Sequence, residues 1–136
     1  MTIFDAILAG DIPCHKVYED DRVLAFLDIA PLTDGHTLVI PKKGAPKLDQ
    51  LDPADAAAVM AAIQKILPGL RDATGCPDAT VALHDGPAAG QEVPHVHFHL
   101  IPRKPGDAGG PVHALFSSRA SEANLASLAA KIQESL

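Results

Sequence analysis

The spacing of apolar residues predicts a short helix and then three strands in the first third of the chain. At the start, apolar residues recur at helical spacing until Gly10 ends the pattern, and they are Ile3, Phe4, Ile7 and Leu8. Three short apolar runs follow over residues 17–19, 22–27 and 37–40. The pair Asp20-Asp21 has turn chemistry, so we expect the first two runs to form a hairpin.

The longest periodic segment begins after Asp52, which can cap a helix whose first residue is Pro53. Its apolar stripe consists of Val59, Ile63, Ile66, Leu67 and Leu70. Pro68 lies within this stripe, and we expect it to kink or end the helix unless tertiary contacts compensate.

Two more strands are expected over residues 79–84 and 94–101. The tail from Ser121 to Leu136 has a helical pattern that Ser121 could cap. Strands on both sides of one long helix predict an α+β domain with an antiparallel sheet of about five strands. We place this domain in residues 1–105, and we expect residues 106–136 to form a C-terminal extension of the same domain.

Composition narrows the classes of function. A chain of 136 residues fits one domain, and its net charge of −6 lacks the basic balance typical of nucleic-acid binding. Cys14 and Cys76 are too few for a disulfide framework. We find neither a leader pattern nor an apolar run of membrane-spanning length, so we expect a cytoplasmic protein with no membrane partner.

Three of the seven histidines alternate with apolar residues near the end of the expected sheet. In a strand, His95, His97 and His99 would share one face. Such a face could be a solvated surface, a metal site, or a site where one imidazole attacks phosphorus. The histidines alone leave these three interpretations open.

The loop before the histidines favours phosphate. Gly86 and Gly90 allow backbone N–H groups to approach an anion, and Gln91 adds a side-chain amide. Asp85 and Glu92 could instead orient metal-binding histidines, so a metal site stays open at this point.

Residues 94–101, Pro-His-Val-His-Phe-His-Leu-Ile, resemble the signature of the histidine triad family. Six further segments resemble the same family in the same order, namely residues 3–4, 10–13, 17–21, 25–29, 35–42 and 89–94. The similarity extends from about Ile3 to Arg103, and it is greatest to the nucleotide-binding, purine nucleoside phosphoramidase branch in its bacterial form.

The resemblance implies roles for four histidines. His97 would be the nucleophile and form a nucleotidyl-histidine intermediate that water hydrolyses. His99 would lie beside the phosphate or the leaving-group oxygen. His95 would be structural and pair with His36. No cofactor and no essential metal would be needed.

The resemblance also implies a nucleotide site. Gly90, Gln91 and the backbone near Glu92 would line the phosphate, and Asp28 would bind the ribose hydroxyls. The apolar slot for the base would consist of Ile3, Phe4, Ile7, Ile12, Phe26 and Ile29. The expected partners are a purine nucleotide or nucleoside phosphoramidate and a second copy of the chain, which would dimerise through the long helix and the adjoining strand.

The chain departs from the family pattern at several positions. His84 stands where an asparagine commonly bonds near the phosphate, so the resemblance places His84 in the nucleotide site. Glu92 stands where a serine often follows the glutamine. Some bacterial members bind zinc through an N-terminal cysteine pair and a histidine after the Pro-Lys pair, but this chain has Asp5 and Gly44 there. Two other functions are alternatives: hydrolysis of dinucleoside polyphosphates, and nucleotide binding with vestigial catalysis.

Overall fold

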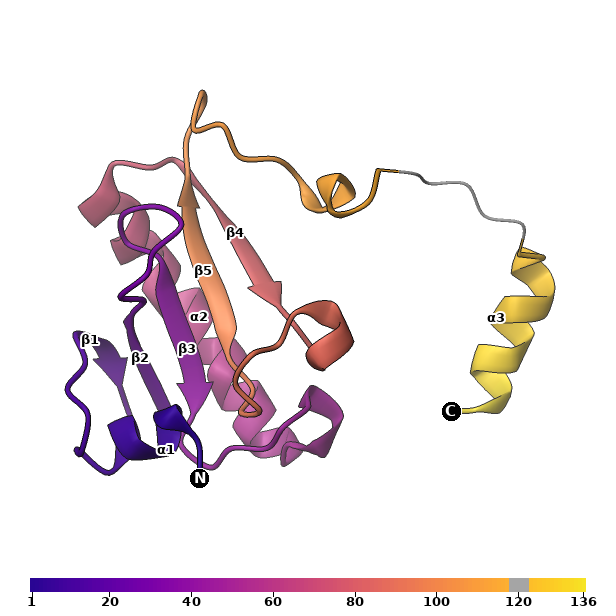
Figure 1. The fold of residues 1–136 in the computed structure, drawn as a ribbon, viewed down its shortest axis with the longest axis horizontal. Coiled ribbons are helices and arrows are strands. Elements are labelled where there is room, and N and C mark those ends of the chain that lie inside the picture. The colour runs from indigo at the N-terminus through magenta and orange to yellow at the C-terminus, as the bar shows by residue number, and fades with distance from the viewer. Residues whose placement is uncertain (118–122) are drawn as a thin grey trace.

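The computed structural model describes residues 1–117 and 123–136, and its centre is a five-stranded antiparallel sheet (Figure 1). The strands are β1 (Lys16–Glu19), β2 (Val23–Leu27), β3 (Thr37–Pro41), β4 (Asp78–Leu83) and β5 (Phe98–Arg103). Their order across the sheet is β1-β2-β3-β5-β4. The helices are α1 (Ile3–Leu8), α2 (Pro53–Thr74) and α3 (Leu125–Glu134). The expected α+β class and sheet are confirmed.

β2 and β3 are buried on both faces because α1 and α2 cover opposite sides of the sheet. One core cluster joins Val23, Val39 and Leu100 to the apolar stripe of α2. The other joins Leu24, Phe26, Leu38 and Ile40 to Phe4 of α1. Alternate residues of β2 and β3 therefore point to different layers, and both layers are apolar.

The predicted start of α2 is confirmed, since the Asp52 side chain accepts a hydrogen bond from the Ala54 N–H. At α1, Thr2 and Asp5 form a capping box that the apolar spacing alone does not predict. Pro68 does not end α2, which continues to Thr74. Pro68 lies on the exposed face, while Ile66 and Leu70 keep the helix packed on the sheet on either side of it.

The last strand begins later than the sequence predicts. β5 starts at Phe98, so the expected strand over residues 94–101 is wrong at its first four positions. The Val96 N–H donates to the Ala45 carbonyl at 2.9 Å, and the His95 N–H donates to the Val93 carbonyl at 2.8 Å. These bonds hold the segment outside the sheet ladder, and of the three histidines only His99 lies in a strand.

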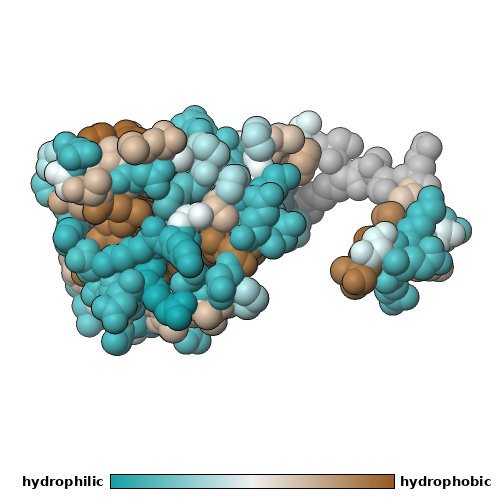
Figure 2. All heavy atoms as spheres, turned by 90° about the horizontal axis from the view of Figure 1, so that it is seen from below, coloured by the Kyte–Doolittle hydropathy of each residue, from teal (hydrophilic) through white to brown (hydrophobic). Residues whose placement is uncertain are grey.

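The C-terminal extension begins at a compact polar turn. Arg103 contacts Asp107 through two hydrogen bonds, at 2.7 and 3.2 Å, and also donates to the Gly110 carbonyl. α3 lies apart from the sheet (Figure 1), and apolar side chains gather on one side of it (Figure 2). Asn124 caps α3, whereas Ser121, the expected cap, lies outside the described residues. That the extension belongs to the same domain stays a prediction.

No helix in the described part of the chain has both the length and the hydropathy that crossing a membrane requires.

Candidate active site

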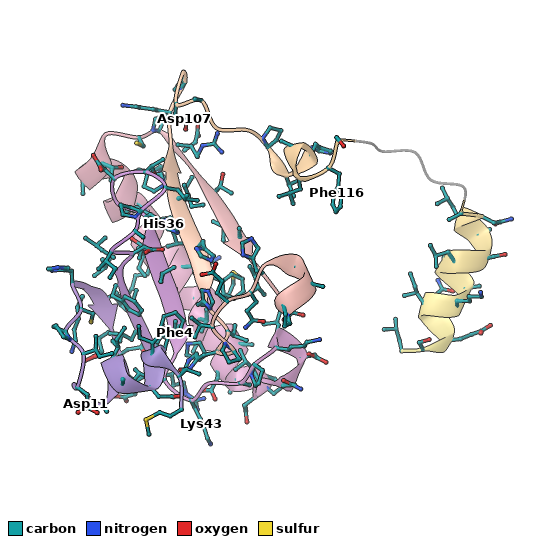
Figure 3. The ribbon with its side chains drawn as sticks, in the orientation of Figure 1. Phe4, Asp11, His36, Lys43, Asp107 and Phe116 are labelled. Carbon is teal, nitrogen blue, oxygen red and sulfur yellow. The ribbon has the colours of Figure 1, made fainter. Side chains whose placement is uncertain are left out.

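A cavity of about 540 Å³ opens on the α1 side of the sheet and brings most of the predicted site residues together. His99 lies on β5 opposite Leu38 of β3, and His36 immediately precedes β3. Figure 3 shows His36 and Phe4 at different heights along β3, with side chains filling the space between them. The thirteen predicted residues that line the cavity are Ile3, Phe4, Ile7, Ile12, Phe26, Asp28, Ile29, His36, His84, Gly90, Glu92, His97 and His99. His95 and Gln91 do not line it.

His97 has one ring nitrogen with a fixed proton and one with a free lone pair. Its Nδ1 lies 2.8 Å from the main-chain oxygen of His95. A carbonyl oxygen only accepts hydrogen bonds, so Nδ1 carries the proton and Nε2 keeps the lone pair. Burial lowers the pKa of His97, although the hydrogen bond to His95 opposes this shift. The ring is therefore neutral at neutral pH and nucleophilic at Nε2.

His36 and His99 form a second chain of hydrogen bonds with defined protons. The Leu32 N–H donates to His36 Nδ1 at 3.1 Å, so the proton of neutral His36 is on Nε2. That Nε2–H lies 2.9 Å from His99 Nδ1 and donates to it. Neutral His99 consequently carries its own proton on Nε2. Within the described chain this Nε2 is buried and has no partner, so it is free to donate to a bound ligand.

Burial keeps this pair neutral. It lowers the pKa of His99 to about 4, and the neighbouring rings of His97, His36 and His84 act in the same direction. Burial also lowers the pKa of His36, although the Asp28 carboxylate at 3.8 Å opposes this shift. The site thus presents one lone pair and one N–H donor without a formal charge on any of the three rings.

His36 pairs with His99, and the expected pairing with His95 is wrong. His95 donates from Nε2 to the carbonyl of Pro41, at the far end of β3 from His36. The expected partner changes because His95 precedes β5 and its ring reaches the opposite end of the neighbouring strand. His95 remains structural, since its carbonyl oxygen holds the proton of His97.

Phe4 fixes the rings of two histidines. Its ring meets His97 edge-on at a centroid distance of 5.0 Å and His95 at 5.7 Å. It also packs against Phe26 at 5.7 Å, which ties this contact to the core. Sequence reasoning placed Phe4 in the base slot, but the contact with the nucleophile appears only in three dimensions.

The apolar end of the cavity is larger than the sequence predicts. Besides the six predicted residues, it includes Pro13, Cys14, Leu27, Ala30, Leu32, Leu38 and Val93. Most of these lie in loops without a periodic pattern, so no sequence signal marks them as neighbours. Leu38 is a regular core residue whose cavity contact only the fold reveals.

Gln91 is structural, and its expected place at the phosphate is wrong. Its side chain accepts from the Gly86 N–H at 2.8 Å and donates to the carbonyls of Pro46 and Val93, at 2.7 and 2.9 Å. Both amide N–H groups are used in holding the loop closed, so neither is left to donate to a phosphate.

The loop backbone offers fewer donors than its glycines suggest. The Gly90 N–H donates to the Pro87 carbonyl, and the Gln91 N–H donates to the Gly86 carbonyl. The Glu92 N–H has no acceptor in the part of the chain described. Gly90 has a φ of 100°, which lets the loop turn back toward the cavity. The ring of His84 lies 5.4 Å from that of His99, at the edge of the same loop.

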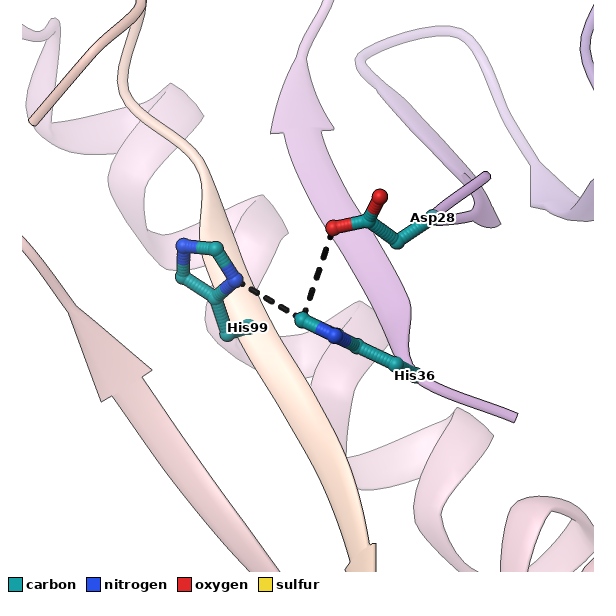
Figure 4. Close-up of side chains that lie close together, drawn as sticks. All are labelled: Asp28, His36 and His99. Carbon is teal, nitrogen blue, oxygen red and sulfur yellow. Dashed lines mark hydrogen bonds and ion pairs between the residues drawn. The ribbon is translucent and has the colours of Figure 1, made fainter. Parts of the chain in front are cut away.

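Asp28, His36 and His99 are the one group among the described residues whose ligand atoms lie close enough together for a metal ion (Figure 4). A metal on His36 Nε2 would move the ring proton to Nδ1, where it would oppose the Leu32 N–H. The hydrogen bonds therefore suit a proton between the rings better than a metal. Near His95, Asp5 is the nearby carboxylate, at 3.9 Å, and Gly44 supplies no ligand. Two ligands fall short of a structural zinc site.

The sequence of the chain is similar to those of several known proteins. A family model described as a HIT domain matches residues 9–106. An adenosine 5'-monophosphoramidase of Schizosaccharomyces pombe is 44% identical over 101 residues, which are 74% of this chain and 73% of that protein. An adenylylsulfatase of Arabidopsis thaliana is 41% identical over 105 residues, 77% of this chain and 53% of that protein.

A solved structure extends the likeness to the C-terminal segment. The crystal structure of a HIT family protein from Bacillus subtilis superimposes with a TM-score of 0.87 at 37% identity. The superposition covers 99% of this chain and 96% of that one.

Proposed function

The chain belongs to the histidine triad (HIT) family, and on that basis we propose that it is a nucleotide hydrolase that releases a nucleoside monophosphate from an amine. The observation that carries the proposal is the free Nε2 lone pair of a buried, neutral His97. The name of the monophosphoramidase relative supports the phosphoramidate substrate.

Binding would use the two ends of the cavity differently. A purine base fits the apolar end around Ile7, Ile12 and Phe26, and the Asp28 carboxylate is available to the ribose hydroxyls. The phosphate then lies beside His97 and His99. The N–H groups of His99 Nε2 and of Glu92 are free to donate to its oxygens and to offset charge in the transition state.

The first step forms a bond between His97 Nε2 and the α-phosphorus. The leaving nitrogen takes a proton from a water molecule, and the hydroxide so formed is neutralised by the proton that the second step releases. When the P–N bond breaks, its electron pair leaves with a neutral amine. The substituted His97 ring keeps its proton at Nδ1, and the His95 carbonyl that accepts this proton stabilises the positive ring.

In the second step water attacks the phosphorus. The electron pair of the P–N bond returns to His97 Nε2, the nucleoside monophosphate is released, and the water proton passes to solvent. The lone pair is thereby restored for the next cycle. His99 and His36 keep their protons throughout, because their role is to bind and orient.

The proposal is tested by trapping the intermediate. We expect mass spectrometry of the acid-sensitive adduct to find one nucleotidyl group per chain after rapid mixing with adenosine 5'-phosphoramidate. The His97→Ala variant should still bind adenosine monophosphate but form no adduct and show no turnover. Binding without any adduct in the native chain would instead support the vestigial, binding-only alternative.

We also propose that two copies form a homodimer through α2 and β4. β4 lies at an edge of the sheet, and its Val81 is 43% exposed. Met60 on α2 is 47% exposed. A second copy would cover both and pair the open edge. Light scattering of Val81→Lys should then show a monomer. Val17→Lys, at the opposite edge and 44% exposed, is the matched control.

Cytoplasmic localisation stays a prediction.

A further inference from the structure

The cavity around His97 contains carboxylates but no permanent cation. Among the residues that line it in the described chain there is no Lys or Arg, and its two acidic residues are Asp28 and Glu92. The three central histidines are neutral, because burial lowers the pKa of each. The lining therefore carries net negative charge before any substrate binds.

Asp28 has partners for its carboxylate, whereas Glu92 has none within the described chain. Asp28 accepts a hydrogen bond from the Ala30 N–H at 2.9 Å and lies 3.8 Å from His36. Glu92 is exposed and has neither an ion pair nor a hydrogen bond within the described chain. No cation of the described chain therefore contacts its carboxylate directly.

Glu92 also lies at the reacting end of the cavity. It belongs to the loop between β4 and β5, together with Gly90, and this loop leads directly into His97 and His99. Ile3 and Ile7 of α1 and Ile12 line the same cavity. A nucleotide with its base among these three residues and its phosphorus at His97 would present its leaving group near the loop that carries Glu92.

We propose that Glu92 selects the leaving group by charge, so that the site prefers nucleoside monophosphates joined to cationic amines and disfavours anionic leaving groups. This inference rests on the proposed function and specifies its substrate class. Sulfate, further phosphates and carboxylate-bearing amines would meet an unpaired negative charge. An ammonium group on the leaving amine would gain a counter-ion.

The size of the effect follows from the exposure of Glu92. Water screens the carboxylate, so a single charge on the leaving group should change kcat/KM by about threefold in either direction. The ratio between a cationic and an anionic leaving group should therefore be on the order of tenfold.

A matched series of substrates tests the inference. Adenosine monophosphate is joined through nitrogen to ethylenediamine, to propylamine or to β-alanine, which differ mainly in the charge at the far end. The kcat/KM of each is measured for the native chain, for Glu92→Gln and for Glu134→Gln. Glu134 lies on α3, outside the cavity, and provides a control with the same chemical change.

We expect the ratio of kcat/KM between the ethylenediamine and β-alanine substrates to fall by about tenfold in Glu92→Gln and to stay at the native value in Glu134→Gln. Intrinsic differences between the three amines cancel, because each variant is compared with the native chain on the same substrates. In the native chain, high salt should reduce the same ratio, which gives a second readout that needs no variant.

The possible failures are distinguishable. Turnover of all three substrates with a ratio that neither Glu92→Gln nor salt changes would overturn the role of Glu92 and leave the proposed function intact. Absence of turnover and of adduct with every substrate would reject the proposed function, and the inference with it.

Discussion

His36 Nε2 lies 2.9 Å from His99 Nδ1 and donates its proton to it. This bond determines which nitrogen of His99 can donate to a ligand, because a ring that accepts at Nδ1 carries its proton at Nε2. The Leu32 N–H determines the tautomer of His36 in the same way. The main-chain N–H of Leu32 thus determines which nitrogen of His36 is protonated, and His36 in turn determines which nitrogen of His99 is protonated.

Without the His36 donor, nothing should hold the proton of His99 at Nε2, and both tautomers of His99 should be populated. In His36→Phe we expect kcat to fall about tenfold to a hundredfold, with a smaller change in KM, since the loss corresponds to one to two hydrogen-bond equivalents. Nitrogen NMR of the His99 ring should change from protonation at Nε2 to a mixture of tautomers. His113→Phe, at an exposed position outside the cavity, is the control. An unchanged His99 tautomer in His36→Phe would refute the role of the pair.

The pH profile should report the neutral form of His97. Protonation removes the attacking lone pair, and the pKa of His97 lies below its usual value of 6.5. Activity is therefore full above this pKa and is lost as the pH falls through it. We expect kcat/KM to be flat near neutrality and to decline on the acid side of pH 6.5. An acid limb centred above pH 6.5 would contradict the neutral, buried nucleophile.

Phe4 should affect both stability and catalysis. It is 5% exposed and contacts the rings of Phe26 and His97. We expect Phe4→Ala to lower the free energy of unfolding by about 3 kcal/mol or more and to lower kcat. Phe116→Ala removes the same ring from a position that is 77% exposed, and the change should stay within about 0.5 kcal/mol. Urea unfolding of both variants provides the comparison.

Gly44 provides a test of the packing around His95. A Cβ at this position would overlap the His95 ring, so Gly44→Ala must displace the ring or the loop. We expect a loss of about 2 kcal/mol in stability and a lower kcat, because the His95 carbonyl orients His97. Gly69→Ala meets nothing within 4 Å on α2 and should stabilise the helix by about 0.5–1 kcal/mol. Similar stability changes in both variants would refute this account of the packing.

Local patterns predicted the elements well because burial is periodic. The stripe from Val59 to Leu70 identified α2, and the short apolar runs identified β2 and β3. The cap at Asp52 acts within three residues of the helix start, so the sequence predicts it directly.

The errors arose where long-range hydrogen bonds decide the local structure. His95 and His97 alternate as in a strand, yet the bond from Val96 to Ala45 keeps them outside the sheet. Gln91 was expected to meet the phosphate, but Pro46, distant in sequence, takes one of its donors. The pairing of His36 depends on which strand neighbours β3, which no spacing within one segment reveals.

Because β2 and β3 are buried on both faces, the sheet beside the cavity should be far more rigid than the loop before β5. His36 directly precedes β3 and His99 lies on β5, where we expect amide hydrogens to exchange at a cost close to the full free energy of unfolding. Glu92 and Gly90 are exposed residues of a loop, which we expect to open at a lower cost. If Glu92 selects the leaving group as we propose, substitutions in that loop would alter this choice while His36 and His99 stay held by the sheet.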